Sequence, residues 1–167
     1  TALLLYEVCQ RVPGGHIIEC GCGVSTVVMS LAIAQANAEF VSLEENERWL
    51  AATRQALERC GRPDRVRLLH APLTALEWDS RQLQAHDDTG LGEFQADLLL
   101  VDAPPGIIGR GGVLPRMARH LRRGAVVLLD DAARLGEREC VELWTKTGLA
   151  TLEGFLIQGT GVAVLRT

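Results

Sequence analysis

Hydrophobic and polar positions along the chain fall into two alternating patterns. Short, mostly apolar runs are typical of strands that are buried on both faces of a parallel sheet. Such runs lie within residues 16–20, 40–43, 66–69, 96–102 and 124–129. Two further β-like segments, 150–158 and 161–166, are joined by Gly159-Thr160-Gly161, which is typical of a hairpin.

The segments between these runs carry apolar residues three and four positions apart, which predicts helices. We expect these helices at residues 3–11, 25–38, 46–60, 73–83, 115–124 and 133–147. Ser25 and Asn46 are candidate N-caps, because their side-chain oxygens can accept hydrogen bonds from the first helical amides. Residues 86–92 are polar and predict a surface loop.

The regular alternation of strand and helix predicts an α/β fold. We expect a doubly wound, mostly parallel seven-stranded sheet with a C-terminal antiparallel hairpin. The 167 residues suit one domain that spans 1–167. In open sheets of this kind ligands bind beyond the carboxyl ends of the strands, so the residues that follow each strand are the ones to inspect.

Composition narrows the class of protein. A hydrophobic content of 47% and a charged content of 23% are ordinary for a globular domain, and no apolar run reaches transmembrane length. The net charge of −4 gives no electrostatic reason to expect nucleic acid as a partner. Five cysteines, an odd number scattered through apolar stretches, favour reduced thiols over a disulfide framework. We therefore expect a cytoplasmic protein that binds a small molecule and neither nucleic acid nor membrane.

The first strand ends in Glu19-Cys20-Gly21-Cys22-Gly23, a glycine-spaced turn that suits a nucleotide-like cofactor. The match to a dinucleotide fingerprint is incomplete, because Thr26 stands where the third glycine belongs. Glu44 ends the second strand, 21 residues after Gly23. A carboxylate there can accept both ribose hydroxyl protons, which dinucleotide and S-adenosylmethionine sites have in common.

Acidic residues also end the later strands. Asp102 follows the fourth strand, and Asp130-Asp131 follows the fifth. The pair at 130 and 131 is compatible with a metal site, but equally with one helix-capping and one solvated acid. Arg110 lies on a glycine-rich loop beside Asp102, where it is a candidate for binding an anionic substrate or a solvated loop residue.

Taken in order, these motifs resemble class I S-adenosylmethionine-dependent methyltransferases over nearly the whole chain. The resemblance implies a Rossmann-like methyltransferase domain whose acidic Glu19 lies near the methionine end of the cofactor. Its other cofactor-binding residues would be Gly21, Gly23, Ser25, Glu44, Ala71 and Asp102. At Ala71-Pro72 many members carry an acid near the adenine, so adenine would be held here by backbone and apolar contacts.

The acids after strands four and five further resemble the metal site of catechol-type O-methyltransferases. This resemblance implies Mg²⁺ held by Asp102, Asp130 and Asp131, with methyl transfer to an oxygen of a small-molecule acceptor. One departure is Pro105, which stands where that family commonly carries a lysine base. Asp102 and Arg110 are then the candidate catalytic residues.

Two other functions stay open at this point. A nicotinamide-dependent oxidoreductase would share the sheet and Glu44, although the missing third glycine counts against it. A non-catalytic module for cofactor binding or assembly is compatible with the absence of an evident general base. The sequence also leaves a homo-oligomer open.

Overall fold

The computed structural model describes residues 2–12, 14–33, 38–157 and 159–167. These residues form a seven-stranded sheet. Its strands, in spatial order, are β3 (Arg67–His70), β2 (Phe40–Glu44), β1 (Ile17–Cys20), β6 (Ala96–Val101), β7 (Leu121–Asp130), β9 (Val162–Arg166) and β8 (Thr151–Leu156). Neighbours from β3 to β7 run parallel, and β9 pairs antiparallel with both β7 and β8. The predicted mostly parallel sheet with its C-terminal hairpin is confirmed.

The central strands supply both halves of the core because successive side chains point to opposite faces. On β6, Leu98 and Leu100 belong to one cluster of buried residues, whereas Leu99 and Val101 belong to the other. All four are at most 1% exposed. Such two-sided burial explains why these strands are continuously apolar in the sequence.

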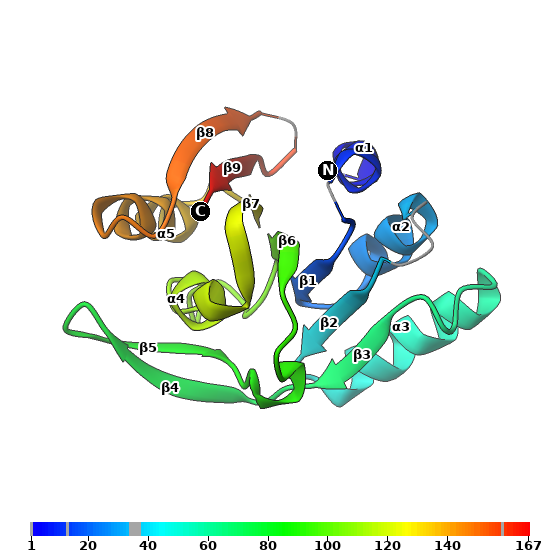
Figure 1. The fold of residues 1–167 in the computed structure, drawn as a ribbon. Helices are drawn as coiled ribbons and strands as arrows, with labels where there is room; N and C mark the ends of the chain where they lie inside the picture. The colour runs from blue at the N-terminus through cyan, green and yellow to red at the C-terminus, as the bar shows by residue number, and fades with distance from the viewer. Residues whose placement is uncertain (1, 13, 34–37, 158) are drawn as a thin grey trace.

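Helices cover both faces (Figure 1). The helices are α1 (Ala2–Arg11), α2 (Val24–Ala32) and α3 (Glu47–Arg59) on one side, with α4 (Val113–Met117) and α5 (Leu135–Lys146) on the other. Leu5, Met29 and Leu57 bring the first three helices into one core cluster, and Trp144 brings α5 into the other. The result is the three-layer arrangement of a doubly wound fold.

The predicted helix over residues 73–83 is wrong. This segment forms β4 (Leu73–Trp78) and β5 (Arg81–His86), which pair antiparallel as a separate two-stranded sheet beside α4. Asp79 and Ser80 connect the strands with φ values of 49° and 58°. Two successive residues with positive φ match the twist of a tight hairpin, although neither residue is the glycine that usually signals such a turn.

Other element boundaries also differ from the prediction. Among the described residues α2 ends at Ala32, and residues 34–37, where the helix was expected to continue, lie outside them. The helix that contains Pro115, α4, begins at Val113, is short and continues as a 3₁₀ turn (Ala118–His120). The fifth strand therefore starts at Leu121, ahead of the predicted Gly124. The predicted loop over residues 86–92 contains a further 3₁₀ turn (Thr89–Leu91), and His86 and Asp88 in it are buried.

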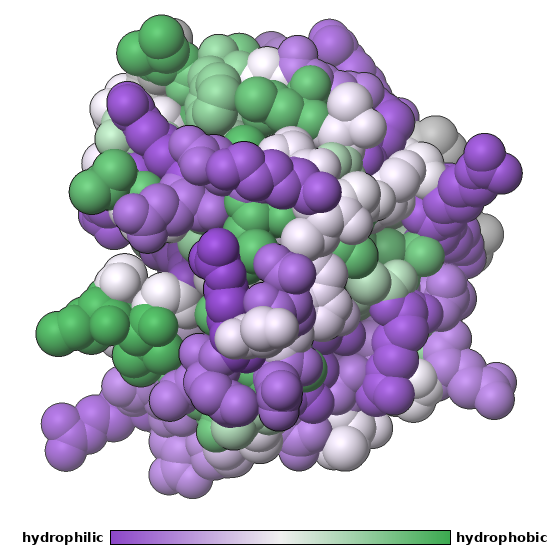
Figure 2. Space-filling model, turned by 90° about the vertical axis from the view of Figure 1, so that its left-hand side faces the viewer, coloured by the Kyte–Doolittle hydropathy of each residue, from purple (hydrophilic) through white to green (hydrophobic). Residues whose placement is uncertain are grey.

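The surface is mainly polar on the side of α5 and the β4–β5 hairpin. Figure 2 views this side, where hydrophilic residues predominate and hydrophobic ones gather in separate patches. Among the described residues, no helix combines the length and apolar character needed to cross a bilayer.

Candidate functional site

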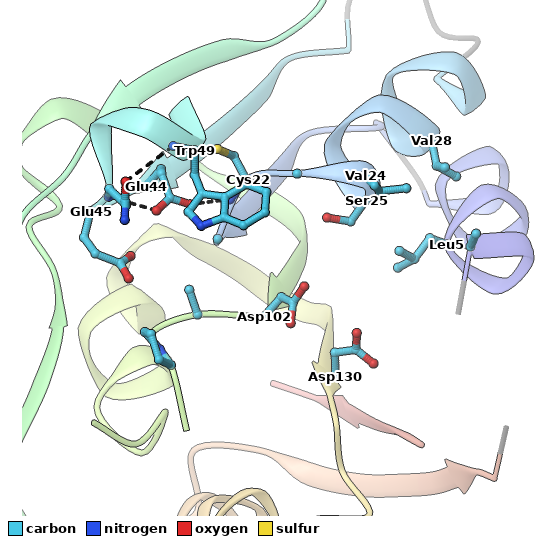
Figure 3. Close-up of a pocket in the computed structure, with 16 residues that line it drawn as sticks. Leu5, Cys22, Val24, Ser25, Val28, Glu44, Glu45, Trp49, Asp102 and Asp130 are labelled. Atoms are coloured by element: carbon cyan, nitrogen blue, oxygen red, sulfur yellow. Dashed lines mark hydrogen bonds between the residues drawn. The ribbon is translucent and has the colours of Figure 1, made fainter. Parts of the chain in front are cut away.

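The site lies at the carboxyl edge of the sheet. A cavity of about 520 Å³ opens there, beyond the ends of β1, β2, β6 and β7 (Figure 3). Its walls are Ala2, Leu5, Gly21, Cys22, Gly23, Val24, Ser25, Val28, Glu44, Glu45, Asn46, Trp49, Asp102, Ala103, Pro105 and Asp130. This is the position at which open α/β sheets bind their ligands.

The two glycines of the β1–α2 turn have different roles. Gly21 has φ +99°, and a Cβ on it would lie 2.7 Å from the Cβ of Ala103, so a side chain there would force the turn and the end of β6 apart. A Cβ on Gly23 would meet no protein atom within 4 Å. Gly21 thus closes the packing of two loops, while Gly23 leaves free space at the cavity wall.

Glu44 joins the first two strand ends. Its Oε2 accepts a hydrogen bond from the Cys22 amide at 2.9 Å, and its Oε1 accepts one from the Asn46 amide at 2.8 Å. The residue is only 4% exposed but lines the cavity. Two backbone donors hold the carboxylate in one orientation and leave further lone pairs for a ligand's hydroxyl groups.

Glu19 lies beneath the turn and does not line the cavity. Ser25 donates its hydroxyl to Oε1, and Thr26 and Ser42 donate theirs to Oε2, each at 2.6 Å. Complete burial raises the pKa of Glu19 to about 7, although the three hydroxyl donors lower it. Ser25 therefore does not cap α2 as expected. Instead, Thr26 Oγ1 accepts the Gly23 amide at 2.8 Å and links the turn to Glu19.

Trp49 and Glu45 line the cavity and were missed at the sequence level. Trp49 is 60% exposed and stands beside Glu44 and Cys22 in Figure 3. A tryptophan in the first turn of the helix that follows the acid at the end of β2 is the sequence signal that could have identified it. Glu45 Oε2 lies 2.8 Å from Nε2 of the fully buried His86, and this hydrogen bond is the main reason why the pKa of Glu45 is lowered.

Asp102 and Asp130 line the opposite end of the cavity, facing the apolar side chains of Leu5, Val24 and Val28 (Figure 3). Burial raises the pKa of Asp102 to about 6, an effect that Arg110 opposes and Asp130 reinforces. Asp130 Oδ1 is buried and has no hydrogen-bond partner among the described residues. This end of the cavity therefore offers acceptor atoms rather than donors.

Arg110 is buried behind these acids, and it does not line the cavity. Its Nη2 lies 3.2 Å from Asp102 Oδ1 and 3.1 Å from Asp131 Oδ2, while Nη1 donates to the Asp130 carbonyl at 2.9 Å. Arg134 Nη1 lies 2.6 Å from the same Asp131 oxygen. Arg110 is therefore not accessible to an anionic substrate in the cavity, although its position on a glycine-rich loop had suggested such a role.

The expected metal site does not fit this arrangement. Asp131 is occupied by two guanidinium groups and does not line the cavity, and Asp102 shares one of them. Within the described part of the chain, no group of three or more His, Cys, Asp or Glu side chains is arranged to hold a metal ion. Asp102, Asp130 and Asp131 are therefore not arranged to hold Mg²⁺.

The remaining predicted cofactor residue, Ala71, is 3% exposed and packs in the core, and its amide donates to the Glu44 carbonyl. Of the predicted site residues, the cavity thus brings together Gly21, Gly23, Ser25, Glu44, Asp102 and Asp130. Glu19, Ala71, Arg110 and Asp131 lie outside its walls.

A family model described as a methyltransferase domain matches residues 18–132, well over half of the chain. The chain belongs to this family. The match includes the glycine turn, Glu44, and the acids after β6 and β7, so all the residues that line the cavity except Ala2 and Leu5 lie within it. No curated protein sequence matches the chain.

The alignments with three solved structures of this fold each cover 99% of this chain. A methyltransferase from Geobacter sulfurreducens is 22% identical, with a TM-score of 0.72 over 77% of its own chain. An O-methyltransferase from Bacillus cereus in complex with SAH is 18% identical, with a TM-score of 0.72 over 80% of its chain. An SAH-bound methyltransferase from Podospora anserina is 22% identical, with a TM-score of 0.69 over 76% of its chain.

The family and the fold confirm the prediction of a class I S-adenosylmethionine-dependent methyltransferase with the architecture of O-methyltransferases. These structures are at most 22% identical to the chain, so they show its fold and not its acceptor or the roles of its residues. The geometry of the cavity is the basis on which those roles can be proposed.

Proposed function

We propose that this methyltransferase domain transfers the methyl group of S-adenosylmethionine to an oxygen atom of a small-molecule acceptor. The observation that carries the proposal is the cavity at the carboxyl edge, with Glu44 fixed by two amides at one end and paired carboxylates at the other. O-methyltransferases among the similar structures support the choice of oxygen. Bound S-adenosylmethionine would supply an electrophilic methyl group on a sulfonium.

Glu44 and Trp49 are the residues we assign to the adenosine part of the cofactor. The oriented carboxylate of Glu44 accepts hydrogen bonds from vicinal ribose hydroxyls, and the exposed indole of Trp49 offers a flat apolar surface. Gly21 and Gly23 let the backbone of the turn approach the ligand. The chain's contribution at this end is binding and orientation.

Asp102 and Asp130 are the residues we assign to the acceptor. Both line the cavity opposite Leu5, Val24 and Val28, so an acceptor with an apolar body and a hydroxyl group can contact both walls. A hydrogen bond from that hydroxyl to the carboxylate of Asp130 or Asp102 would aim the oxygen along the line of displacement. The carboxylates disfavour an anionic acceptor.

Isothermal titration calorimetry with S-adenosylhomocysteine tests the cofactor assignment. Glu44→Ala removes charge-assisted hydrogen bonds of about 1.5 to 3 kcal/mol, which weakens binding roughly 10- to 150-fold. Glu47→Ala is the matched control, because Glu47 is the same residue type three positions after Glu44. Its side chain is 82% exposed and lies outside the cavity. Equal affinities of the wild type and a folded Glu44→Ala protein would contradict the assignment.

A methyl-transfer screen then separates the competing functions. Binding of S-adenosylhomocysteine with turnover of a hydroxylated acceptor supports the proposal, whereas binding without turnover of any acceptor favours a non-catalytic module. A heat of binding with NAD but not with S-adenosylhomocysteine would favour the oxidoreductase.

The proposal includes a single domain over 1–167 and a cytoplasmic location, in keeping with five free cysteines. Size-exclusion chromatography with light scattering addresses the homo-oligomer.

A further inference from the structure

The loop that carries Arg110 is packed against the rest of the protein directly after that residue. Trp144 Nε1 donates to the Gly111 carbonyl at 2.8 Å, and a Cβ on Gly112 would lie 2.5 Å from the Gln84 carbonyl oxygen of the β4–β5 hairpin. The Arg110 side chain is 4% exposed, and its Nε donates to the Pro104 carbonyl at 3.3 Å. The guanidinium group is thus buried and held in one position by its hydrogen bonds.

The charges around this guanidinium are mainly negative. Nη2 bridges Asp102 and Asp131, and Nε lies 3.8 Å from Oε1 of Glu137, a residue that is 3% exposed. The Asp130 backbone carbonyl adds a further oxygen at 2.9 Å from Nη1. Carboxylates brought together with so little solvent repel one another unless a cation neutralises them.

A planar guanidinium suits this position because it can donate in several directions at once. A divalent ion there would need the same carboxylate oxygens that Arg110 contacts, and it would also lie within a few ångströms of a fixed positive charge. The residues that would have formed a metal site instead hold an arginine.

We infer that Arg110 is the built-in cation of the acceptor site and takes the place that a divalent ion would need between Asp102 and Asp131. Methyl transfer in this protein then requires no added metal, a consequence that rests on the function proposed above. Arg110 acts as a positioning residue, because it contacts neither the cavity nor the reacting atoms and instead orients Asp102 at the cavity wall.

The test is to remove the positive charge and ask whether a divalent ion replaces it. Mn²⁺ is titrated into the protein, and free Mn²⁺ is followed by electron paramagnetic resonance. The wild type is expected to have no saturable site. In Arg110→Met the acids at 102, 131 and 137 lose the guanidinium group that they share, while Arg134 still lies 2.6 Å from Asp131. The variant should gain one site with a dissociation constant of about 10⁻⁴ to 10⁻³ M, typical of weak carboxylate sites.

Two variants separate charge from packing. Arg110→Lys keeps the positive charge and is expected to bind no Mn²⁺, whereas Arg110→Met with Asp131→Asn should lose the gained site. Arg122→Met is the matched control: it frees only Asp97, which its Nη1 contacts at 2.8 Å on another part of the surface, and no site should appear.

Saturable Mn²⁺ binding by the wild type, or a folded Arg110→Met protein that binds none, would overturn the inference. If Arg110→Met does not fold, as judged by circular dichroism, the wild-type titration decides alone. These measurements need neither cofactor nor acceptor, so they remain decisive even if S-adenosylhomocysteine fails to bind and the proposed function is abandoned.

Discussion

The buried carboxylate of Glu19 makes a pH-dependent prediction about stability. Ser42→Ala deletes one of the three hydroxyl donors that Glu19 accepts at 2.6 Å, and the Ser42 side chain is fully buried on β2. No water replaces the missing hydroxyl unless the strands open. The free energy of unfolding should therefore fall, by an amount that depends on whether Glu19 carries its charge.

The magnitude follows from the two protonation states. Above the pKa of about 7 the lost hydrogen bond is to a carboxylate, which costs about 1.5 to 3 kcal/mol, whereas below it the bond is to a neutral carboxyl and costs about 0.5 to 1.5 kcal/mol. Ser42→Ala should thus be more destabilising at pH 8.5 than at pH 5.5, by about 1 kcal/mol. Urea unfolding followed by circular dichroism at both pH values gives this difference.

Ser30→Ala provides the control for this measurement. Ser30 is as buried as Ser42, but its hydroxyl donates to the Val27 carbonyl, which does not titrate. Its destabilisation should be the same at the two pH values. A pH-independent effect of Ser42→Ala as well would refute the assignment of a titrating carboxylate beneath the glycine turn.

The wild type carries the same signature with a defined sign. Because burial raises the pKa of Glu19 from 4.5 to about 7, the native protein holds a proton that the unfolded chain has already released between these values. The stability contributed by this group is present in full below pH 4.5, falls as pH rises through 7 and then levels off. The full change is roughly 3 kcal/mol at 1.36 kcal/mol per pKa unit. Glu19→Gln should remove this component.

Two further predictions concern the loops of the cavity. Gly21→Ala should lower the free energy of unfolding by about 1 to 3 kcal/mol, because its φ of +99° and its contact with Ala103 both oppose a Cβ. Gly23→Ala should change the free energy of unfolding by less than about 0.5 kcal/mol, since a Cβ there meets no protein atom within 4 Å. Equal urea midpoints for the two variants would contradict this prediction. In hydrogen exchange, the amide of Ile107, which is 98% exposed, should exchange well before the amides of β6. The Val113 amide donates to the Arg110 carbonyl and should be protected. Similar protection of Ile107 and β6 would show that the loop has no mobile segment at Ile107.

The parallel sheet was predictable because its strands are buried on both faces. Leu98 to Val101 form a continuous apolar run that admits few other interpretations, and the glycines and acids at the strand ends mark the edge where the cavity lies. The hairpin at 73–86 was not predictable in the same way. Leu73 and Leu76 fit helical spacing, whereas Leu76 and Trp78 fit the alternation of a strand. Asp79-Ser80 adopts positive φ without the glycine that usually marks such a turn.

Within the site, the sequence identified which strand ends carry acids but not which acid faces the ligand. Asp130 lines the cavity, and its neighbour Asp131, at φ 59°, turns to the arginines behind it. The side-chain direction of adjacent residues at a strand end depends on the backbone of the following turn, which is set by tertiary contacts. The same holds for Arg110: its glycine-rich loop suggested a side chain open to solvent or substrate, but the side chain is buried and the loop is packed at Gly111 and Gly112.

The hydrogen-bond donors to Glu19, Glu44 and Asp102 determine which of these three carboxylates can contact a ligand. Glu19 accepts three hydroxyl hydrogen bonds, is fully buried and so has no access to a ligand. Glu44 accepts two backbone amides, which orient it while leaving lone pairs directed at the cavity. Asp102 is oriented by a guanidinium and remains at the cavity wall. Hydroxyl, amide and guanidinium donors thus hold three similar acids in different positions: Glu19 is buried, whereas Glu44 and Asp102 line the cavity, where we propose that they contact the cofactor and the acceptor. Substitution of the donors should affect these proposed roles separately.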